Sequence, residues 1–132
     1  MDLSSFDVSE AASRGATLIL RNPATGEDLF ADDGKPITIT LLGSDSSEYR
    51  KRIRATANQR INSRKKRTVE QIEQESIEML AAVTQGWCGI VVDGEEVAFS
   101  QDEAKKLYRR FSWITEQVDE FVSDRSNFLT SA

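Results

Sequence analysis

The sequence predicts an α+β fold with a mainly helical body, a small N-terminal antiparallel β-unit and a short β-hairpin near residues 87–99. Three observations support this prediction. Isoleucine and leucine alternate with threonine over residues 37–41, as they do in a half-buried strand. Apolar residues recur every three or four positions after residue 48, as they do in amphipathic helices. An Asp-Gly pair at residues 93–94 lies between two β-prone runs, which is typical of a hairpin turn.

The length of 132 residues is that of a single domain. We expect residues 1–14 to form a flexible N-terminal arm, because they are polar with only scattered apolar side chains. Residues 15–43 contain two β-prone runs and two turn signals, so they form the small β-unit. A sheet of two or three strands is only marginally stable alone. The β-unit is therefore expected to pack against the helical body of residues 44–132, which contains the β-hairpin.

Capping signals and apolar spacing predict the helices of the body. Asp45 or Ser46 can cap the first helix, and Thr68 can cap the second in a capping box with Gln71. A further capping box opens a third helix at residue 101, and a fourth helical stretch follows with apolar residues at positions 114, 118, 121 and 122. One long or bent helix from residue 101 to about residue 124 also fits this repeat. The first helix has a narrow apolar stripe formed by Tyr49, Ile53, Ala57 and Ile61.

The composition argues against an enzyme. The chain has no histidine and a single cysteine, which excludes Ser-His-Asp triads, Cys-His pairs and histidine-based metal sites. It also lacks the GxxxxGK[ST] and GxGxxG phosphate-binding patterns. We therefore expect no catalytic, cofactor-binding or metal-binding residues and no cofactor. The first ten residues do not resemble a signal peptide, and no apolar run is long enough for a membrane span, so we expect a cytoplasmic protein.

Cys88 is the first residue to consider as a reactive group. A nucleophilic cysteine needs a neighbour that lowers its pKa, such as a cation or a helix N-terminus. The sequence neighbours of Cys88 are tryptophan, glycine and aliphatic residues. The sequence therefore predicts a buried, inert thiol within a core strand.

The second candidate is a basic segment. Nine basic residues and one acidic residue lie between Glu48 and Arg67, although the whole chain has a net charge of −5. Nucleic-acid binding would favour interleaved aromatic residues, and only Tyr49 is present. An acidic partner, or the acidic remainder of the chain, is therefore the preferred contact over nucleic acid. The candidate partner-binding residues are Arg50, Arg54 and Arg60 for the polar contact and Trp87 and Trp113 for an apolar anchor. Each tryptophan is also a candidate core residue.

The C-terminal part of the chain carries a distinctive order of short motifs. A helical stretch leads to a GW-G element at residues 84–89, and Val97-Ala98-Phe99-Ser100 follows a short hairpin. A helix that starts with acidic, alanine and lysine residues comes next, and a terminal helix runs through Phe121 to Asn127-Phe128. Over about residues 45–130, this order resembles the tail assembly chaperones of long-tailed, siphovirus-like bacteriophages.

The resemblance implies a non-catalytic function. Members of this family bind the tape measure protein, help the tail tube protein to assemble around it and leave the finished particle. The resemblance therefore implies that the partners are the tape measure protein and the tail tube protein, and that the protein also associates with itself. It also implies that the protein is located in the host cytoplasm and is absent from the mature virion. Two alternatives remain open. The protein could be a structural tail or connector component that the virion retains, or a small nucleic-acid-binding regulator that uses the basic segment.

Overall fold

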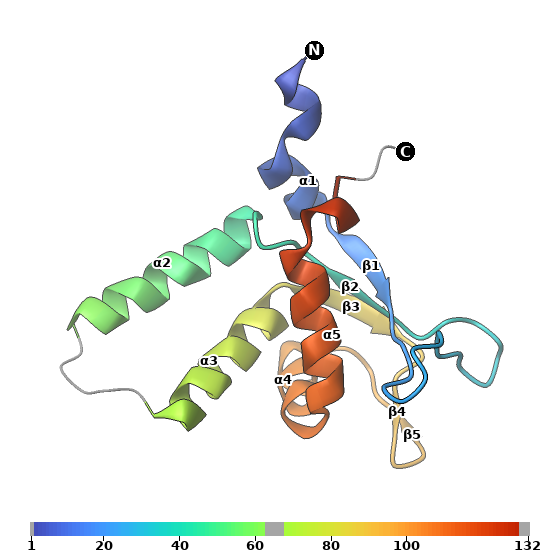
Figure 1. Cartoon of the computed structure of the whole chain (residues 1–132). Coiled ribbons are helices and arrows are strands. Elements are labelled where there is room, and N and C mark those ends of the chain that lie inside the picture. Colours follow the sequence, from blue (N-terminus) through green and yellow to red (C-terminus); the bar gives the residue numbers. More distant parts are fainter. Residues whose placement is uncertain (1, 63–67, 130–132) are drawn as a thin grey trace.

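The computed structural model describes residues 2–62 and 68–129, and for residues 59–62 it describes the backbone alone. These residues form an α+β fold with five α-helices, a three-stranded antiparallel sheet and a two-stranded hairpin (Figure 1), which confirms the predicted fold class. In chain order the elements are η1 (Leu3–Phe6), α1 (Val8–Arg14), β1 (Ala16–Ile19), β2 (Thr38–Leu41), α2 (Ser47–Asn62), α3 (Val69–Ala82), β3 (Thr84–Cys88), β4 (Val91–Val92), β5 (Glu95–Glu96), α4 (Gln101–Arg110), α5 (Ser112–Ser123) and η2 (Arg125–Asn127).

The three-stranded sheet has one buried and one open face. Its strand order is β1-β2-β3, and both neighbouring pairs are antiparallel. Leu18, Ile39 and Leu41 are buried in the main hydrophobic core together with residues of α3, α4 and α5. Thr38 and Thr40 alternate with them and are only half-buried, because successive side chains of a strand point to opposite faces. The predicted alternation is therefore confirmed for β2.

The third strand of this sheet comes from the helical body. The hairpin predicted near residues 87–99 is present but shorter, since residues 84–88 pair with β2 instead. The chain turns away from the sheet at Gly89, where φ is +81° and an added Cβ would lie 3.3 Å from the Cβ of Ala31. Positive φ angles at Asp93 and Gly94 then form the predicted Asp-Gly turn. The β-unit of residues 15–43 is thus completed by a strand that is distant in the sequence.

The N-terminal segment differs from the flexible arm that the sequence predicts for residues 1–14. Its described part contains η1 and α1. The carboxylate of Asp7 caps α1, and Ala11 and Ala12 are buried. The small side chain of Ala12 allows a close approach to Gly43, where an added Cβ would lie 2.9 Å from the Cβ of Ala12. This contact fixes α1 against the body.

The long C-terminal helix that fits the sequence pattern is divided in two. Phe111 has φ −114° and ψ 86°, so α4 ends before it and α5 begins after it. Such a break leaves the last carbonyl groups of α4 without helical partners. The hydroxyl of Thr115 donates a hydrogen bond of 2.7 Å to one of them, the carbonyl oxygen of Tyr108. After α5 and η2, Phe128 is buried.

Helices α2 and α3 form what we call the arm, which extends away from the sheet on the left of Figure 1. In α3, Leu80 and Ala81 are buried in the main core. In α2, none of the described side chains is buried, and only Tyr49 and Thr56 are half-buried. The arm is therefore attached to the body mainly through the end of α3 and the start of α2. Within the described residues, no helix is both long and apolar enough to cross a membrane.

Candidate functional site

The sequence defines the start of α3 locally. The hydroxyl of Thr68 accepts a hydrogen bond of 3.2 Å from the backbone N–H of Gln71, and the side chain of Gln71 accepts one of 3.0 Å from the N–H of Thr68. This reciprocal pair is the predicted capping box. It satisfies backbone donors that the first turn of a helix leaves free.

A buried hydroxyl pair fixes the other end of α3. The hydroxyl of Thr84 donates a hydrogen bond of 2.7 Å to the carbonyl oxygen of Leu80. A threonine hydroxyl carries one hydrogen, so the hydroxyl of Tyr108, at 2.7 Å, must donate to Thr84. Burial raises the pKa of Tyr108 to about 12. The pair connects α3, β3 and α4 at the base of the arm.

A buried carboxylate fixes the start of α2. Both oxygens of Asp45 accept hydrogen bonds from Arg125, at 2.7 and 3.1 Å. Arg50 lies 3.5 Å from the same carboxylate, whose side chain is only 8% exposed. The hydrogen bonds from Arg125 hold the pKa of Asp45 below its usual value, with a smaller contribution from Arg50. The carboxylate thus joins the base of α2 to the C-terminal η2.

The end of α3 and the start of α2 are thus both fixed to the body. Between the two helices lies an apolar groove with a volume of about 290 Å³. We call it the arm groove, and its lining residues are Tyr49, Ile53, Thr56, Ala57, Ile72, Glu75, Ser76 and Met79. Ile53 and Ile72 are 48% and 49% exposed, although isoleucine is among the residues most often buried. The apolar stripe that the sequence predicts for α2 therefore lines a half-open groove instead of a closed core.

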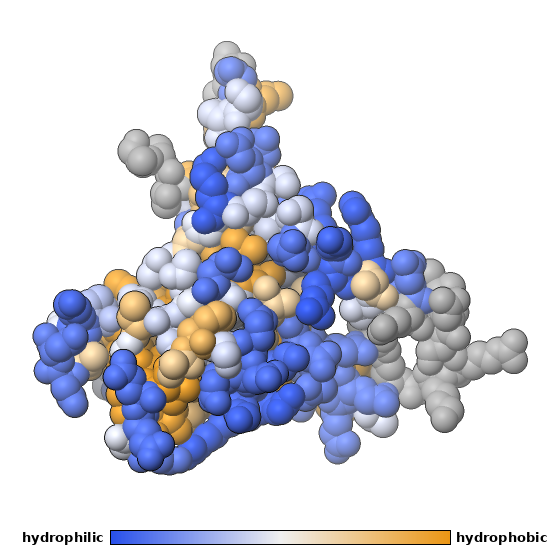
Figure 2. Space-filling model, turned by 180° about the vertical axis from the view of Figure 1, so that it is seen from behind, coloured by the Kyte–Doolittle hydropathy of each residue, from blue (hydrophilic) through white to orange (hydrophobic). Residues whose placement is uncertain are grey.

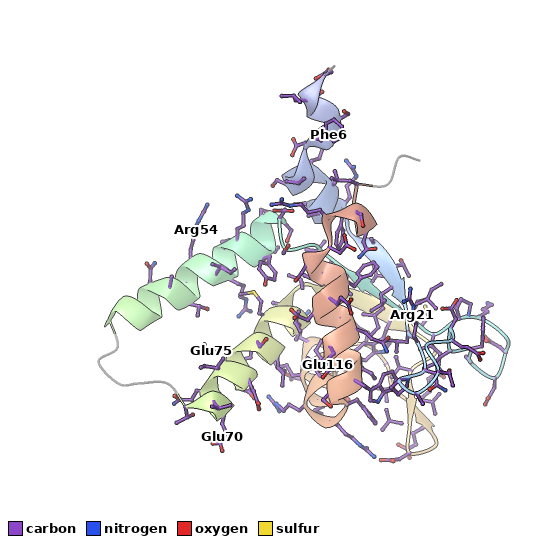
Figure 3. All side chains as sticks on the ribbon, viewed as in Figure 1. Phe6, Arg21, Arg54, Glu70, Glu75 and Glu116 are labelled. Atoms are coloured by element: carbon purple, nitrogen blue, oxygen red, sulfur yellow. The ribbon has the colours of Figure 1, made fainter. Side chains whose placement is uncertain are left out.

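The two walls of the arm groove carry opposite charge. The described part of α2 presents four exposed basic side chains, Arg50, Lys51, Arg52 and Arg54. Helix α3 has acidic residues and no basic residue, and its acidic members are Glu70, Glu73, Glu75 and Glu78. Figure 3 shows Arg54 on the side of α2 that faces away from α3, and Glu70 and Glu75 on α3.

The basic side chains of α2 lie next to lining residues in the helix but do not line the arm groove themselves. Residues three apart are neighbours on a helix surface, which places Arg50 beside Ile53 and Arg54 beside Ala57. An apolar floor between a helix with exposed basic residues and a helix with acidic residues can bind an amphipathic segment in a defined orientation. Seen from behind in Figure 2, hydrophilic residues cover much of the side that holds the arm, and hydrophobic residues gather on the opposite side.

Two of the five predicted partner-binding residues are exposed on α2, and neither of them lines the arm groove. These are Arg50 and Arg54, and Arg50 also contacts Asp45. Arg60 belongs to α2, but its side chain lies outside the described residues. Trp87 and Trp113 are half-buried and pack against the main core. Neither tryptophan lines the arm groove.

Trp87 has a structural contact of its own. Its indole Nε1 donates a hydrogen bond of 2.8 Å to the carbonyl oxygen of Val97. Its ring also packs edge-to-face against Phe99, with ring centroids 5.0 Å apart. These contacts hold the segment after the β4–β5 hairpin against β3. Within the GW-G element, Trp87 therefore packs against the core, which agrees with its alternative interpretation as a core residue.

Cys88 is exposed, so the predicted burial of this thiol is wrong. The reason is the two-residue period of a strand. Trp87 points toward the core, and Cys88, the next residue of β3, points to the open face, opposite Thr38 of β2. The aliphatic sequence neighbours of Cys88 do not surround it in space.

Among the residues that the structure describes, no group of three or more cysteine, aspartate or glutamate side chains is arranged to hold a metal ion. Comparisons with protein-family models, with curated proteins and with solved structures found no match to this chain.

Proposed function

We propose that the protein is a tail assembly chaperone of a long-tailed bacteriophage, which binds the tape measure protein without catalysis and promotes assembly of the tail tube. The observation that carries this proposal is the arm groove, a half-open apolar groove on an arm that projects from the folded body. The order of motifs over residues 45–130 supports the same function, through its resemblance to this family.

The groove indicates the kind of client segment that fits. A helix with a stripe of apolar residues would cover Ile53 and Ile72, which are the most exposed apolar side chains of the groove. Acidic residues elsewhere on that segment would be attracted by the exposed basic residues of α2, which include Arg50 and Arg54. Complementary charge guides association and orientation, whereas buried apolar area supplies most of the affinity. In this proposal the protein acts in the host cytoplasm during assembly and is absent from the mature virion.

Co-expression with the tape measure protein tests the proposal. The client should remain soluble and co-purify with the wild type, whereas Ile53→Ser combined with Ile72→Ser should lose the client. Phe30→Ser is the matched control, because Phe30 is also an exposed large apolar residue but lies outside the arm. Equal loss of the client in the control and the groove variant would contradict the proposed site.

Charge reversal tests the exposed basic residues of α2 separately. Arg54→Glu should slow association, and the difference from wild type should shrink at high salt because salt screens exposed charges. Arg54 is preferable to Arg50, since Arg50 also contacts the buried carboxylate of Asp45. Lys35→Glu, at an exposed loop position, is the control.

If the protein instead stays in purified tails at fixed copy number, the virion-component hypothesis replaces this one. Sub-micromolar binding to duplex DNA at physiological salt would favour the regulator.

A further inference from the structure

Strand β1 is an open edge of the three-stranded sheet, because β2 lies on one side of it and no described strand lies on the other. The N–H of Leu20 donates a hydrogen bond of 2.9 Å to the carbonyl oxygen of Ile37, across the end of the β1–β2 pair. Backbone groups that face the partner strand alternate with groups that face away, so Thr17 and Ile19 direct their N–H and carbonyl groups outward. Both residues are exposed. Among the described residues, no backbone group pairs with this outer edge at either position.

The side chain of Gln117 occupies the next position along the same edge. Its Oε1 accepts a hydrogen bond of 2.9 Å from the N–H of Arg21, and its Nε2 donates one of 2.8 Å to the carbonyl oxygen of Arg21. The side-chain amide thus makes the two bonds that a residue of a neighbouring antiparallel strand would make. The outer edge therefore has the geometry to accept an amide group, and α5 closes it only at Arg21.

A pocket with a volume of about 180 Å³ lies beside this edge, between β1 and α5. Its lining includes Leu18 and Arg21 on the side of β1, and Gln117, Glu120, Phe121 and Asp124 on the side of α5. Leu18 is the β1 residue between Thr17 and Ile19, and its side chain points to the buried face of the sheet. A residue that pairs with Leu18 on an added strand would point its side chain to the same face, and so into this pocket.

The pocket combines apolar walls with a negative charge. Leu18 and Phe121 supply apolar surface. Glu120 and Asp124 supply two exposed carboxylates, and Arg21 supplies one cation, so the acidic groups are in excess. A lysine or arginine side chain fits this combination, because its alkyl stem covers apolar surface while its charged end stays near the carboxylates.

The same carboxylates argue against a second copy of this chain as the occupant. If β1 paired with β1 of another copy about a two-fold axis, α5 of both copies would cover the same face of the joined sheet. Glu120 and Asp124 of the two copies would then approach each other, and like charges in contact oppose association. The excess of negative charge instead favours a basic segment of a different protein.

We propose that the outer edge of β1 binds an extended, basic segment of a second partner protein, which adds to the sheet as an antiparallel strand and places a lysine or arginine side chain in the pocket between Leu18 and Phe121. Main-chain hydrogen bonds to Thr17 and Ile19 supply affinity, and the pocket selects the side chain. None of the residues lining this pocket lines the arm groove, so the inference does not depend on the proposed function. In the view of Figure 3, Arg21 and Arg54 lie on opposite sides of α5.

A titration of the ¹⁵N-labelled full chain with the blocked peptide acetyl-TVKVT-amide tests this inference by NMR. At millimolar peptide, the amide resonances of Thr17 and Ile19 should shift and saturate, whereas those of Ile53 and Ile72 in the arm groove should not. The two valines of the peptide pair with Thr17 and Ile19 when its lysine lies opposite Leu18. N-methylation of both valines should therefore weaken binding at least about tenfold, because it removes the donors of two hydrogen bonds. A peptide with glutamate in place of lysine should also bind more weakly.

Variants of the protein test the two parts of the site. Ile19→Pro should weaken binding, since proline lacks the outward N–H and is tolerated on an edge strand when that N–H faces solvent. Ile19→Thr keeps the N–H and is its control. Glu120→Lys should weaken binding of the lysine peptide by about two- to fivefold, whereas Glu116→Lys, at an exposed position of α5 outside the pocket, should not. Thermal unfolding of each variant checks that the fold is intact.

Three results would overturn the inference. The first is the absence of shifts at Thr17 and Ile19 with millimolar peptide. The second is equal binding of the lysine peptide and its N-methylated or glutamate form. The third is a shift of these two resonances with protein concentration alone, which would indicate that the edge pairs with a second copy. Ile19→Pro should still co-purify with the tape measure protein, because its arm groove is intact, so failure at one site leaves the other testable.

Discussion

Tyr108→Phe tests how the arm is fixed to the body, because it removes a hydroxyl group and keeps the ring. Tyr108 is 1% exposed, and its hydroxyl lies 2.7 Å from that of Thr84. Thr84 already donates its hydrogen to Leu80, so the variant loses only the bond that Tyr108 donates. We expect the free energy of unfolding to fall by about 1 kcal/mol near neutral pH. The corresponding decrease in Tm is about 4 °C for a domain of this size.

The pH dependence of this variant gives a sharper result. Burial raises the pKa of Tyr108 from 10.0 to about 12, so the unfolded state releases the phenolic proton at lower pH than the folded state. The stabilisation by this group is complete below the unfolded-state pKa of 10.0 and is lost as the pH rises toward 12. At about pH 11 the wild type has lost about 1.4 kcal/mol, the equivalent of one pKa unit. The variant loses nothing at this position.

Urea unfolding at about pH 8 and about pH 11, followed by far-UV circular dichroism, measures both effects. The wild type should be more stable than Tyr108→Phe at the lower pH and no more stable than it at the higher pH. Tyr49→Phe, which changes the only other tyrosine, controls for the loss of a half-buried phenol. A difference between wild type and Tyr108→Phe that is the same at both pH values would refute the buried hydroxyl pair.

Three further predictions concern the anchors and the open face. Hydrogen bonds from Arg125 hold the pKa of Asp45 below 3.8, so Asp45→Asn should lower the Tm above that pH. The difference should shrink in calorimetry as the pH falls below 3.8 toward the lower folded-state pKa, and a difference that does not change with falling pH would contradict the ion pair. Gly43→Ala should destabilise by about 1–3 kcal/mol in urea, since its Cβ would lie 2.9 Å from a neighbouring side chain. Gly86→Ala has open space and should be neutral or slightly stabilising; equal losses at both glycines would argue against this packing. Cys88→Ser should change stability by less than about 0.5 kcal/mol, and a native thiol that reacts slowly with a thiol reagent would contradict its exposure.

Features that depend on local chemistry could be predicted from the sequence. The capping box of Thr68 and Gln71 and the turn at Asp93-Gly94 need only residues that are close in the chain. The alternation in β2 also predicts correctly that Ile39 and Leu41 face the core. These signals give the α+β class and most helix starts.

Features that depend on distant pairing could not be predicted in this way. The β-prone run that starts at Trp87 fits a local hairpin as well as a strand of the larger sheet, and the register with β2 selects the sheet. The same register exposes Cys88, because Trp87 occupies the inward position. The large apolar side chains of residues 1–14 are scattered, and α1 is fixed by the contact of Ala12 with Gly43, which no local pattern indicates.

The candidate site also combines features that the sequence predicts with features that it does not. The basic segment is visible in the sequence, and the structure exposes Arg50 and Arg54 on α2 but outside the lining of the arm groove. The apolar stripe of α2 is also visible, but its spacing is the same for a closed core helix and for a half-open groove. Only the separation of α2 from α3 leaves Ile53 and Ile72 half-exposed.

Site-specific photocrosslinking tests the central claim, that the arm groove binds the tape measure protein. The chain would carry p-benzoylphenylalanine at position 72, inside the groove, or at position 17, on the open face of the sheet. After irradiation of cells that co-express the tape measure protein, mass spectrometry identifies the crosslinked peptides. We expect crosslinks to apolar helical segments of the tape measure protein from position 72 and none from position 17. Crosslinks from position 17 alone, or a client that co-purifies without any crosslink from position 72, would contradict the claim.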